Sequence, residues 1–258
     1  MRLMKRILSA AAVLALSASL LVGCSSGTAS SVPVSASSAA ESTVSSVEET
    51  ASSAVDENEA AAAQLLNDLT GSYQELWPVI LADEYQQTWL DDCTALVGEE
   101  NAEAAFEKLS SMVTGDVYGE DAVKAYANGG GAYFCGFTNS LAILTFDGET
   151  STISGTDKDG NVLFSHTYHY IGMEPVRGLY EFQSDDADSG EFTYFFLAPD
   201  TSAETYHIEF RYGSDAEALS QYDAGEYAYW VASGISTDCD QTMIDNCIEL
   251  FCTENLAG

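Results

Sequence analysis

Basic residues and histidines are scarce in this chain. The 8 lysines and arginines stand against 41 aspartates and glutamates, and with 3 histidines the formal net charge is −33. Such a chain repels phosphate groups, which excludes nucleic acid as a partner and argues against membrane attachment through a basic patch. Divalent metals, amines and basic peptides remain open as partners, although acidic residues also serve simply to solvate a secreted surface.

Catalytic signatures are missing as well. The sequence has no Gly-x-Ser-x-Gly, no phosphate-binding loop and no His-Glu-x-x-His, and so few histidines leave little material for acid–base chemistry. It also lacks Cys-x-x-Cys, which argues against a zinc ribbon or a thioredoxin-like site. We therefore expect a protein that is not an enzyme.

The N-terminus has the layout of a bacterial lipoprotein signal peptide. Three basic residues within the first six are followed by an apolar run, 7–21, and a small residue precedes Cys24. The run is too short and too rich in alanine for a membrane-spanning helix. We expect residues 1–23 to be removed and Cys24 to carry the lipid that anchors the protein to the extracytoplasmic face of the cell membrane.

A composition change separates this anchor from a folded domain. Residues 24–59 are mostly Ser, Ala, Thr, Val and Glu and contain no aromatic residue, which is typical of a disordered tether. Residues 60–258 contain all 14 Tyr, 3 Trp and 11 Phe, which is enough for one hydrophobic core. One domain is therefore expected after the tether.

The domain is expected to have helices at both ends and strands between them. Apolar residues at helical spacing predict helices over residues 65–77, 85–96, 102–112, 122–128, 215–221 and 238–254. Aromatic and β-branched residues predict strands over 132–138, 141–146, 152–156, 162–170, 178–183, 191–198 and 205–212. The segment 157–160 starts like a calcium loop, but Tyr168 stands where the bidentate Glu should be, so we interpret it as a hairpin turn. The fold class is α+β, mainly β: a small antiparallel barrel flanked by helices, whose interior could hold one ligand.

Several segments carry a resemblance to a known family. Residues 192–199 end in Ala-Pro, residues 205–210 include His207-Ile208, and Gly213 and a short helical segment follow. In this order they resemble the ZinT (YodA) family. Similar likenesses join 71–78, 168–172 and 178–182 to the opening helix and central strands of that family. The resemblance implies a calycin-like, lipocalin-like barrel with flanking helices. It also implies an extracytoplasmic zinc-binding role that supplies or buffers metal for an ABC importer.

The zinc ligands of the family do not carry over one by one. Three family histidines align with Phe195, Thr205 and His207, so one imidazole is kept. Zinc requires about four ligands at roughly 2.0–2.3 Å. Either the metal site has been rebuilt from other residues, or the pocket now takes a different ligand.

Strand alternation suggests how a rebuilt site would look. His207 and Glu209 share one face of their strand with Arg211, which would either disfavour a cation or neutralise Glu209. His166 and His169 lie on opposite faces of an earlier strand, so at most one of them can join His207. The tentative zinc ligands are therefore His207 and Glu209 with His166 or His169.

Five cysteines follow Cys24 in the chain. An extracytoplasmic compartment would allow them to form disulfides. Cys247 and Cys252 are too far apart on one helix to bridge, so any bridge must reach Cys93 or Cys135 or lie across a bend at Cys239. The odd number leaves at least one thiol unpaired within the chain.

Two functions follow from these observations. One is a lipoprotein that binds a divalent metal, zinc first, through His207 and Glu209. The other is a calycin-like module for a small organic ligand or peptide, with Phe195, Tyr168 and Tyr170 lining a pocket that has lost the metal.

Overall fold

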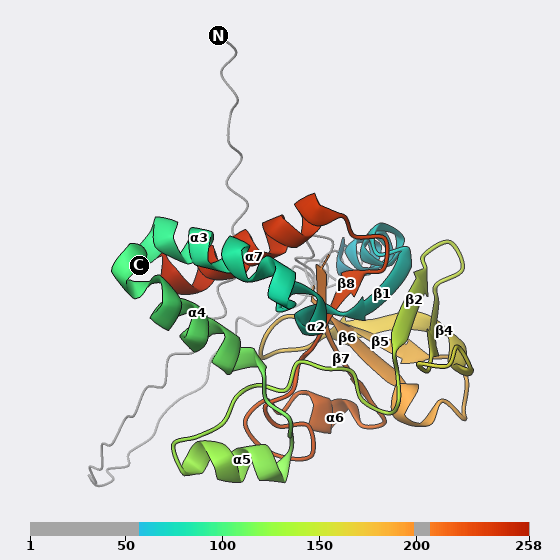
Figure 1. Cartoon of the computed structure of the whole chain (residues 1–258). Coiled ribbons are helices and arrows are strands. Elements are labelled where there is room, and N and C mark those ends of the chain that lie inside the picture. The colour runs from blue at the N-terminus through green and yellow to red at the C-terminus, as the bar shows by residue number, and fades with distance from the viewer. Residues whose placement is uncertain (1–56, 199–206, 258) are drawn as a thin grey trace, which may run out of the picture. The chain divides into compact units, whose positions relative to one another are not determined.

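The computed structural model describes residues 57–198 and 207–257 (Figure 1). The predicted signal peptide at 1–23, the lipidation site Cys24 and nearly all of the predicted tether lie outside the described residues. Residues 57–59 of that tether already belong to a helix, so the folded unit begins no later than residue 57. Within the described part of the chain, no helix combines the length and apolarity needed to cross a membrane.

The described strands form one closed antiparallel barrel. Each strand pairs with its neighbour in the sequence, and β1 pairs with β8 through the register Tyr73↔Ser236. The strands are β1 (Gly71–Glu75), β2 (Ile143–Asp147), β3 (Thr152–Thr156), β4 (Val162–Met173), β5 (Tyr180–Ser184), β6 (Tyr194–Leu197), β7 (His207–Gly213) and β8 (Ala232–Ser236). This eight-stranded barrel confirms the predicted architecture, a small calycin-like barrel flanked by helices.

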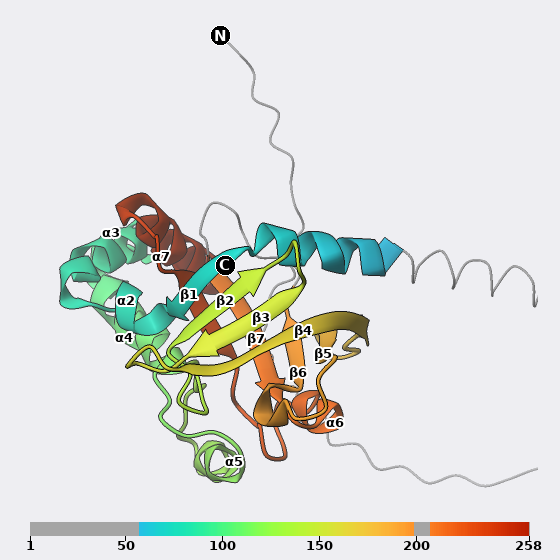
Figure 2. The same cartoon turned by 90° about the vertical axis from the view of Figure 1, so that its right-hand side faces the viewer.

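Helices cover one side of the barrel. In Figures 1 and 2, α3, α4 and α7 gather in one layer, with α2 leading from β1 into it. The helices are residues 57–68, α2 (Leu76–Ile80), α3 (Gln86–Val97), α4 (Glu99–Val113), α5 (Glu120–Ala127), α6 (Ala216–Leu219) and α7 (Gln241–Leu256), with 3-10 turns at Asp83–Tyr85 and Gly190–Phe192. The outer face of the barrel on this side is therefore buried under helices.

Aromatic side chains fill the inside of the barrel. Phe195 is fully buried, lies 5.3 Å from Tyr212 and 6.3 Å from Phe210 between ring centroids, and meets Tyr168 edge to face at 5.4 Å. Gly155 lets Phe164 lie close to β3, because a Cβ there would meet its ring at 2.5 Å. Phe195 and Tyr168 are thus core residues, and the prediction that they line a ligand pocket is wrong.

A second core lies between the barrel and the helices. Ile235 of β8 packs there with Ile80, Trp89, Leu109 and Ile248, each at most 1 % exposed. This core explains why the helical segments read as amphipathic in sequence: one face of each helix covers the sheet or a neighbouring helix.

Two strands were not predicted, and one predicted strand is absent. Residues 71–75 form β1 instead of continuing the predicted 65–77 helix, and the small residues 232–236 form β8. Residues 132–138 form no regular strand and contribute isolated bridges at Phe134. The other predicted strands and the helices at 85–96, 102–112 and 238–254 are confirmed with small shifts at their ends.

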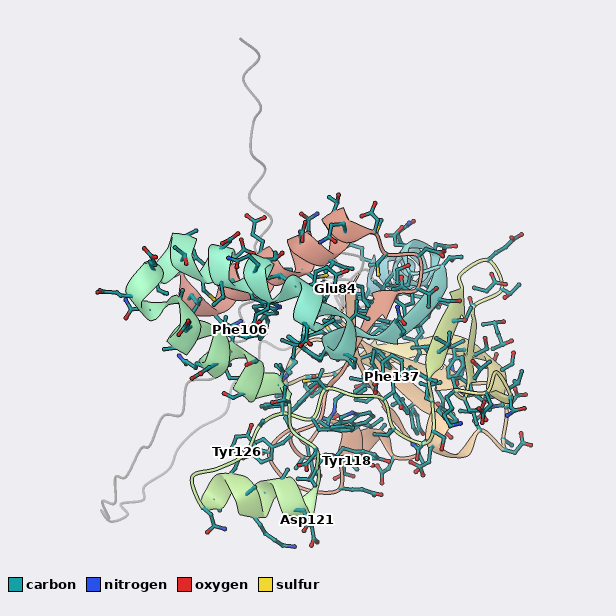
Figure 3. The ribbon with its side chains drawn as sticks, in the orientation of Figure 1. Glu84, Phe106, Tyr118, Asp121, Tyr126 and Phe137 are labelled. Carbon is teal, nitrogen blue, oxygen red and sulfur yellow. The ribbon has the colours of Figure 1, made fainter. Side chains whose placement is uncertain are left out.

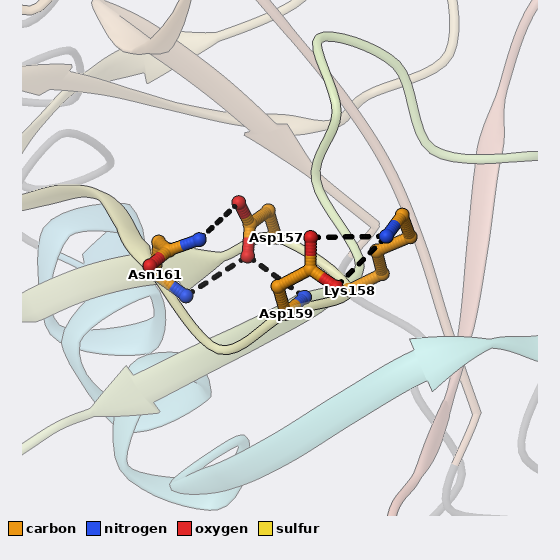
Figure 4. A network of polar contacts seen from close by, with 4 residues as sticks. All are labelled: Asp157, Lys158, Asp159 and Asn161. Atoms are coloured by element: carbon orange, nitrogen blue, oxygen red, sulfur yellow. Dashed lines mark hydrogen bonds and ion pairs between the residues drawn. The ribbon is translucent and has the colours of Figure 1, made fainter.

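The hairpin between β3 and β4 is closed by Asp157 (Figure 4). Its carboxylate accepts hydrogen bonds from the backbone N–H groups of Asp159 and Asn161 at 2.9 and 2.8 Å and from the Asn161 side chain. Lys158 pairs with Asp159. These bonds lower the pKa of Asp157 and confirm the interpretation of 157–160 as a turn.

Candidate functional site

Strand β7 presents its two faces to two different cores. Ile208, Phe210 and Tyr212 point into the barrel, where they are buried among the other aromatic residues. His207 and Glu209 point outward, toward α2 and α7. The predicted alternation is confirmed, but it directs the two candidate ligands to the outside of the barrel and not to its mouth.

A small cavity of about 40 Å³ lies where β7 meets α2 and α7. His207 and Glu209 line it from the strand, and Cys247 and Glu254 line it from α7. The rest of the wall is apolar, with Trp77 of α2 as the largest side chain. An imidazole, two carboxylates and a thiol thus face one space from two separate elements.

The side chains at this cavity are of the types that bind divalent metals, but they are not positioned as a ready set of ligands. Imidazole nitrogen and carboxylate oxygen are ordinary zinc ligands. Burial raises the pKa of the Cys247 thiol to about 12, which disfavours the thiolate that a metal requires. Among the described residues, no group of three or more His, Cys, Asp or Glu is placed to hold a metal ion. The cavity is therefore no closed structural zinc site.

Arg211 does not neutralise Glu209. Its side chain is fully buried, and its guanidinium donates hydrogen bonds to the backbone carbonyls of Leu219, Gln221 and Tyr227. Burial lowers the pKa of Arg211, and the neighbouring side chains that act on this pKa are Tyr222, Arg177 and Tyr133. Arg211 was predicted to repel a cation bound on the face of His207 and Glu209. Its guanidinium instead binds backbone carbonyls of the segment between β7 and β8.

His166 and His169 are not brought to His207. Nδ1 of His166 lies 2.7 Å from Oδ2 of Asp186, and Nδ1 of His169 lies 2.6 Å from Oδ1 of Asp185. Strand β4 is separated from β7 by β5 and β6, and His166 stacks on the barrel core residue Phe164 at 5.9 Å. The prediction that one of these histidines completes a site with His207 is wrong, because the strand order keeps them apart.

A larger cavity of about 340 Å³ lies nearby, between α2 and the segments 113–115 and 134–136. Its lining is mainly apolar, and Trp77 lines it as well as the small cavity. The buried indole N–H of Trp77 lies beside the Cys135 thiol, and this contact works against the burial that raises the pKa of Cys135. Oε1 of Glu75 lies at its wall and accepts a hydrogen bond from the Phe137 backbone N–H at 2.5 Å.

Cys135 lines the larger cavity and lies near Glu209 of the small cavity. Burial and the carboxylate of Glu209 together raise the pKa of its thiol to about 12, so Glu209 lies close to a residue of the larger cavity. Sequence reasoning missed Glu254, Cys247 and Trp77 as wall residues. No local pattern marks them, because α7 meets β7 only through the tertiary fold.

No protein-family model and no curated protein matches the chain. Among solved structures, the Zn(II)-bound ZinT-like domain of Streptococcus pneumoniae AdcA is similar at 15% identity and a TM-score of 0.45, covering 71% of this chain and 89% of that domain. Zn(II)-bound AdcA from the same organism is similar at 14% identity and a TM-score of 0.42, covering 72% of this chain and 35% of that chain.

Proposed function

We propose that this chain is an extracytoplasmic lipoprotein that binds a divalent metal ion, zinc first, in the small cavity between β7 and α7. The observation that carries this proposal is the meeting of His207, Glu209 and Glu254 at one cavity from two elements. The lipid on Cys24 would hold the protein at the cell membrane. Its role would be to supply or buffer metal for an ABC importer.

The imidazole of His207 would be the anchoring ligand, with the carboxylates of Glu209 and Glu254 as partners. Because these groups are not gathered as a ready ligand set, binding would require one carboxylate to turn toward the imidazole and water to complete the coordination. The affinity should be that of an exchangeable site, about micromolar, and not that of a structural zinc finger. Such an exchangeable site suits a protein that passes metal on.

Zinc titration followed by calorimetry tests this proposal on the metal-stripped full chain. A chain with 41 acidic residues also binds zinc weakly at many places, so a matched control is essential. We expect one site of about micromolar affinity that His207→Ala weakens at least tenfold and that His169→Ala leaves unchanged. His169 is the control because it is an exposed histidine paired with Asp185 on another strand. Equal loss in both variants, or no loss in either, would overturn the proposal.

A second candidate function is binding of a small organic molecule in the larger cavity. The cavity volume of about 340 Å³ falls at the lower end of the range for small-molecule sites, about 300–1,000 Å³. Its apolar wall suits a ligand with an apolar body, and the Trp77 N–H at that wall would donate to one acceptor group.

The fluorescent probe anilinonaphthalene sulfonate, which has an apolar body and acceptor oxygens, tests this second function. We expect saturable binding that quenches tryptophan emission and that Val113→Trp abolishes by filling the cavity. Zinc should not displace the probe, because zinc is expected in the small cavity and the probe in the larger one. Unchanged probe binding in Val113→Trp would contradict the assignment.

A further inference from the structure

Two buried thiols face each other between α3 and α7. Sγ of Cys93 lies 3.9 Å from Sγ of Cys252, and both residues are 0 % exposed. They are 159 positions apart in the sequence, so the contact is made by the tertiary fold.

Aromatic packing fixes the helix faces that carry these thiols. Trp89, one turn before Cys93, meets Phe251 edge to face with 6.0 Å between ring centroids. The Trp89 ring also lies 5.5 Å from that of Phe106 of α4, which is labelled in Figure 3. Because Phe251 directly precedes Cys252, these contacts keep the two sulfur atoms opposite each other. Bond formation requires them to approach by about 2 Å, toward the disulfide length of about 2.05 Å.

We propose that Cys93 and Cys252 are joined by a disulfide bond in the protein's extracytoplasmic compartment. The inference rests on the compartment that the N-terminal signal predicts, where disulfides persist, and it is independent of metal binding. Both S–H bonds break and one S–S bond forms. The two electrons and the two protons pass to the disulfide of an exchange partner, whose S–S bond breaks to give two thiols.

Because both sulfur atoms are buried in the folded protein, the bond must form before folding is complete. Burial raises the pKa of each thiol, so the reactive thiolate is scarce once α7 has packed on α3. Exchange therefore occurs during folding, before the helices close over the sulfur atoms. The finished bond ties the C-terminal helix to α3 and closes a loop that contains most of the barrel.

Peptide mapping of the full chain tests the proposal directly. The reduced, unfolded chain is refolded with reduced and oxidised glutathione, alkylated without reductant, and digested with pepsin at low pH to prevent exchange. We expect a linked pair of peptides that contains Cys93 and Cys252 and is two hydrogen atoms lighter than the sum of its free parts. The pair should be present in Cys247→Ala, the matched control on the same helix, and absent in Cys252→Ala.

Recovery of alkylated Cys93 and Cys252 from folded chain would overturn the proposal, as would linkage of either residue to another cysteine. A second readout does not depend on mapping. Reductant should lower the Tm of the wild-type chain by about 5–15 °C and leave the Tm of Cys93→Ala/Cys252→Ala unchanged. The same Tm in both redox states of the wild type would also contradict the bond.

Discussion

Arg211 illustrates how one buried cation can organise a loop. Its guanidinium donates to three backbone carbonyls in the segment between β7 and β8 and lies 4.4 Å from the centroid of the Tyr222 ring. Burial lowers the pKa of Arg211 to about 10, so the side chain stays charged at neutral pH. The guanidinium thus supplies the hydrogen bonds that a helix or sheet would otherwise supply to these buried carbonyl groups.

Replacing Arg211 by lysine should therefore be costly although the charge is kept. A lysine ammonium lacks the planar fork that reaches several carbonyls at once. We expect Arg211→Lys to lower the free energy of unfolding by about 2–4 kcal/mol, measured by urea denaturation at pH 7. Zinc affinity should stay the same, since Arg211 does not line the small cavity. A loss below about 0.5 kcal/mol would show that the loop does not depend on the fork.

The interface between α3 and α7 contains a carboxylate that resists ionisation. Oδ2 of Asp92 is buried and has no hydrogen-bond partner within the described ranges. Burial raises the pKa of Asp92, and the nearby carboxylates of Glu249 and Asp245 on α7 raise it further. The charged form of Asp92 therefore weakens the packing of the two helices at neutral pH.

Asp92→Asn should stabilise the protein at pH 7 by a few degrees in Tm. The folded pKa of Asp92 lies above the unfolded value, so its favourable contribution is complete below the unfolded pKa and is lost as the pH rises through the folded pKa. The gain from Asp92→Asn should accordingly shrink as the pH falls toward 4, measured by thermal unfolding across this range. Asp91→Asn, on the neighbouring exposed position, is the matched control. An equal gain at pH 7 and pH 4 would contradict a titration effect.

At the level of elements, the sequence predicted what has a strong local pattern. The alternation in β4 and β7 and the helical spacing in α3, α4 and α7 are visible in the residues themselves. The two strands that close the barrel are not. Strand β1 is short and continues an apolar spacing that looks helical, while β8 is made of Ala, Ser, Gly and Ile. Both owe their extended form to pairing with each other and with β2 and β7, which is a tertiary effect.

At the level of the whole molecule, the candidate site was only half predictable. The two-residue alternation of a strand predicts that His207 and Glu209 lie on the same face of β7. It does not predict which face of β7 the helices cover. Glu254 joins them because α7 packs beside β7, far along the chain from it in sequence. His166 and His169 were predicted as ligands because they are the remaining histidines of the chain. Each is instead paired with an aspartate of the loop after β5.

Locating a bound zinc ion by anomalous diffraction tests the central claim most directly. Crystals of the full chain would be soaked in zinc and measured on both sides of the zinc absorption edge. The account predicts a peak beside His207, between Glu209 and Glu254, that is lost in His207→Ala crystals. A peak only at the Asp185 and Asp186 pairs with His169 and His166, or none near β7, would contradict metal binding at this site.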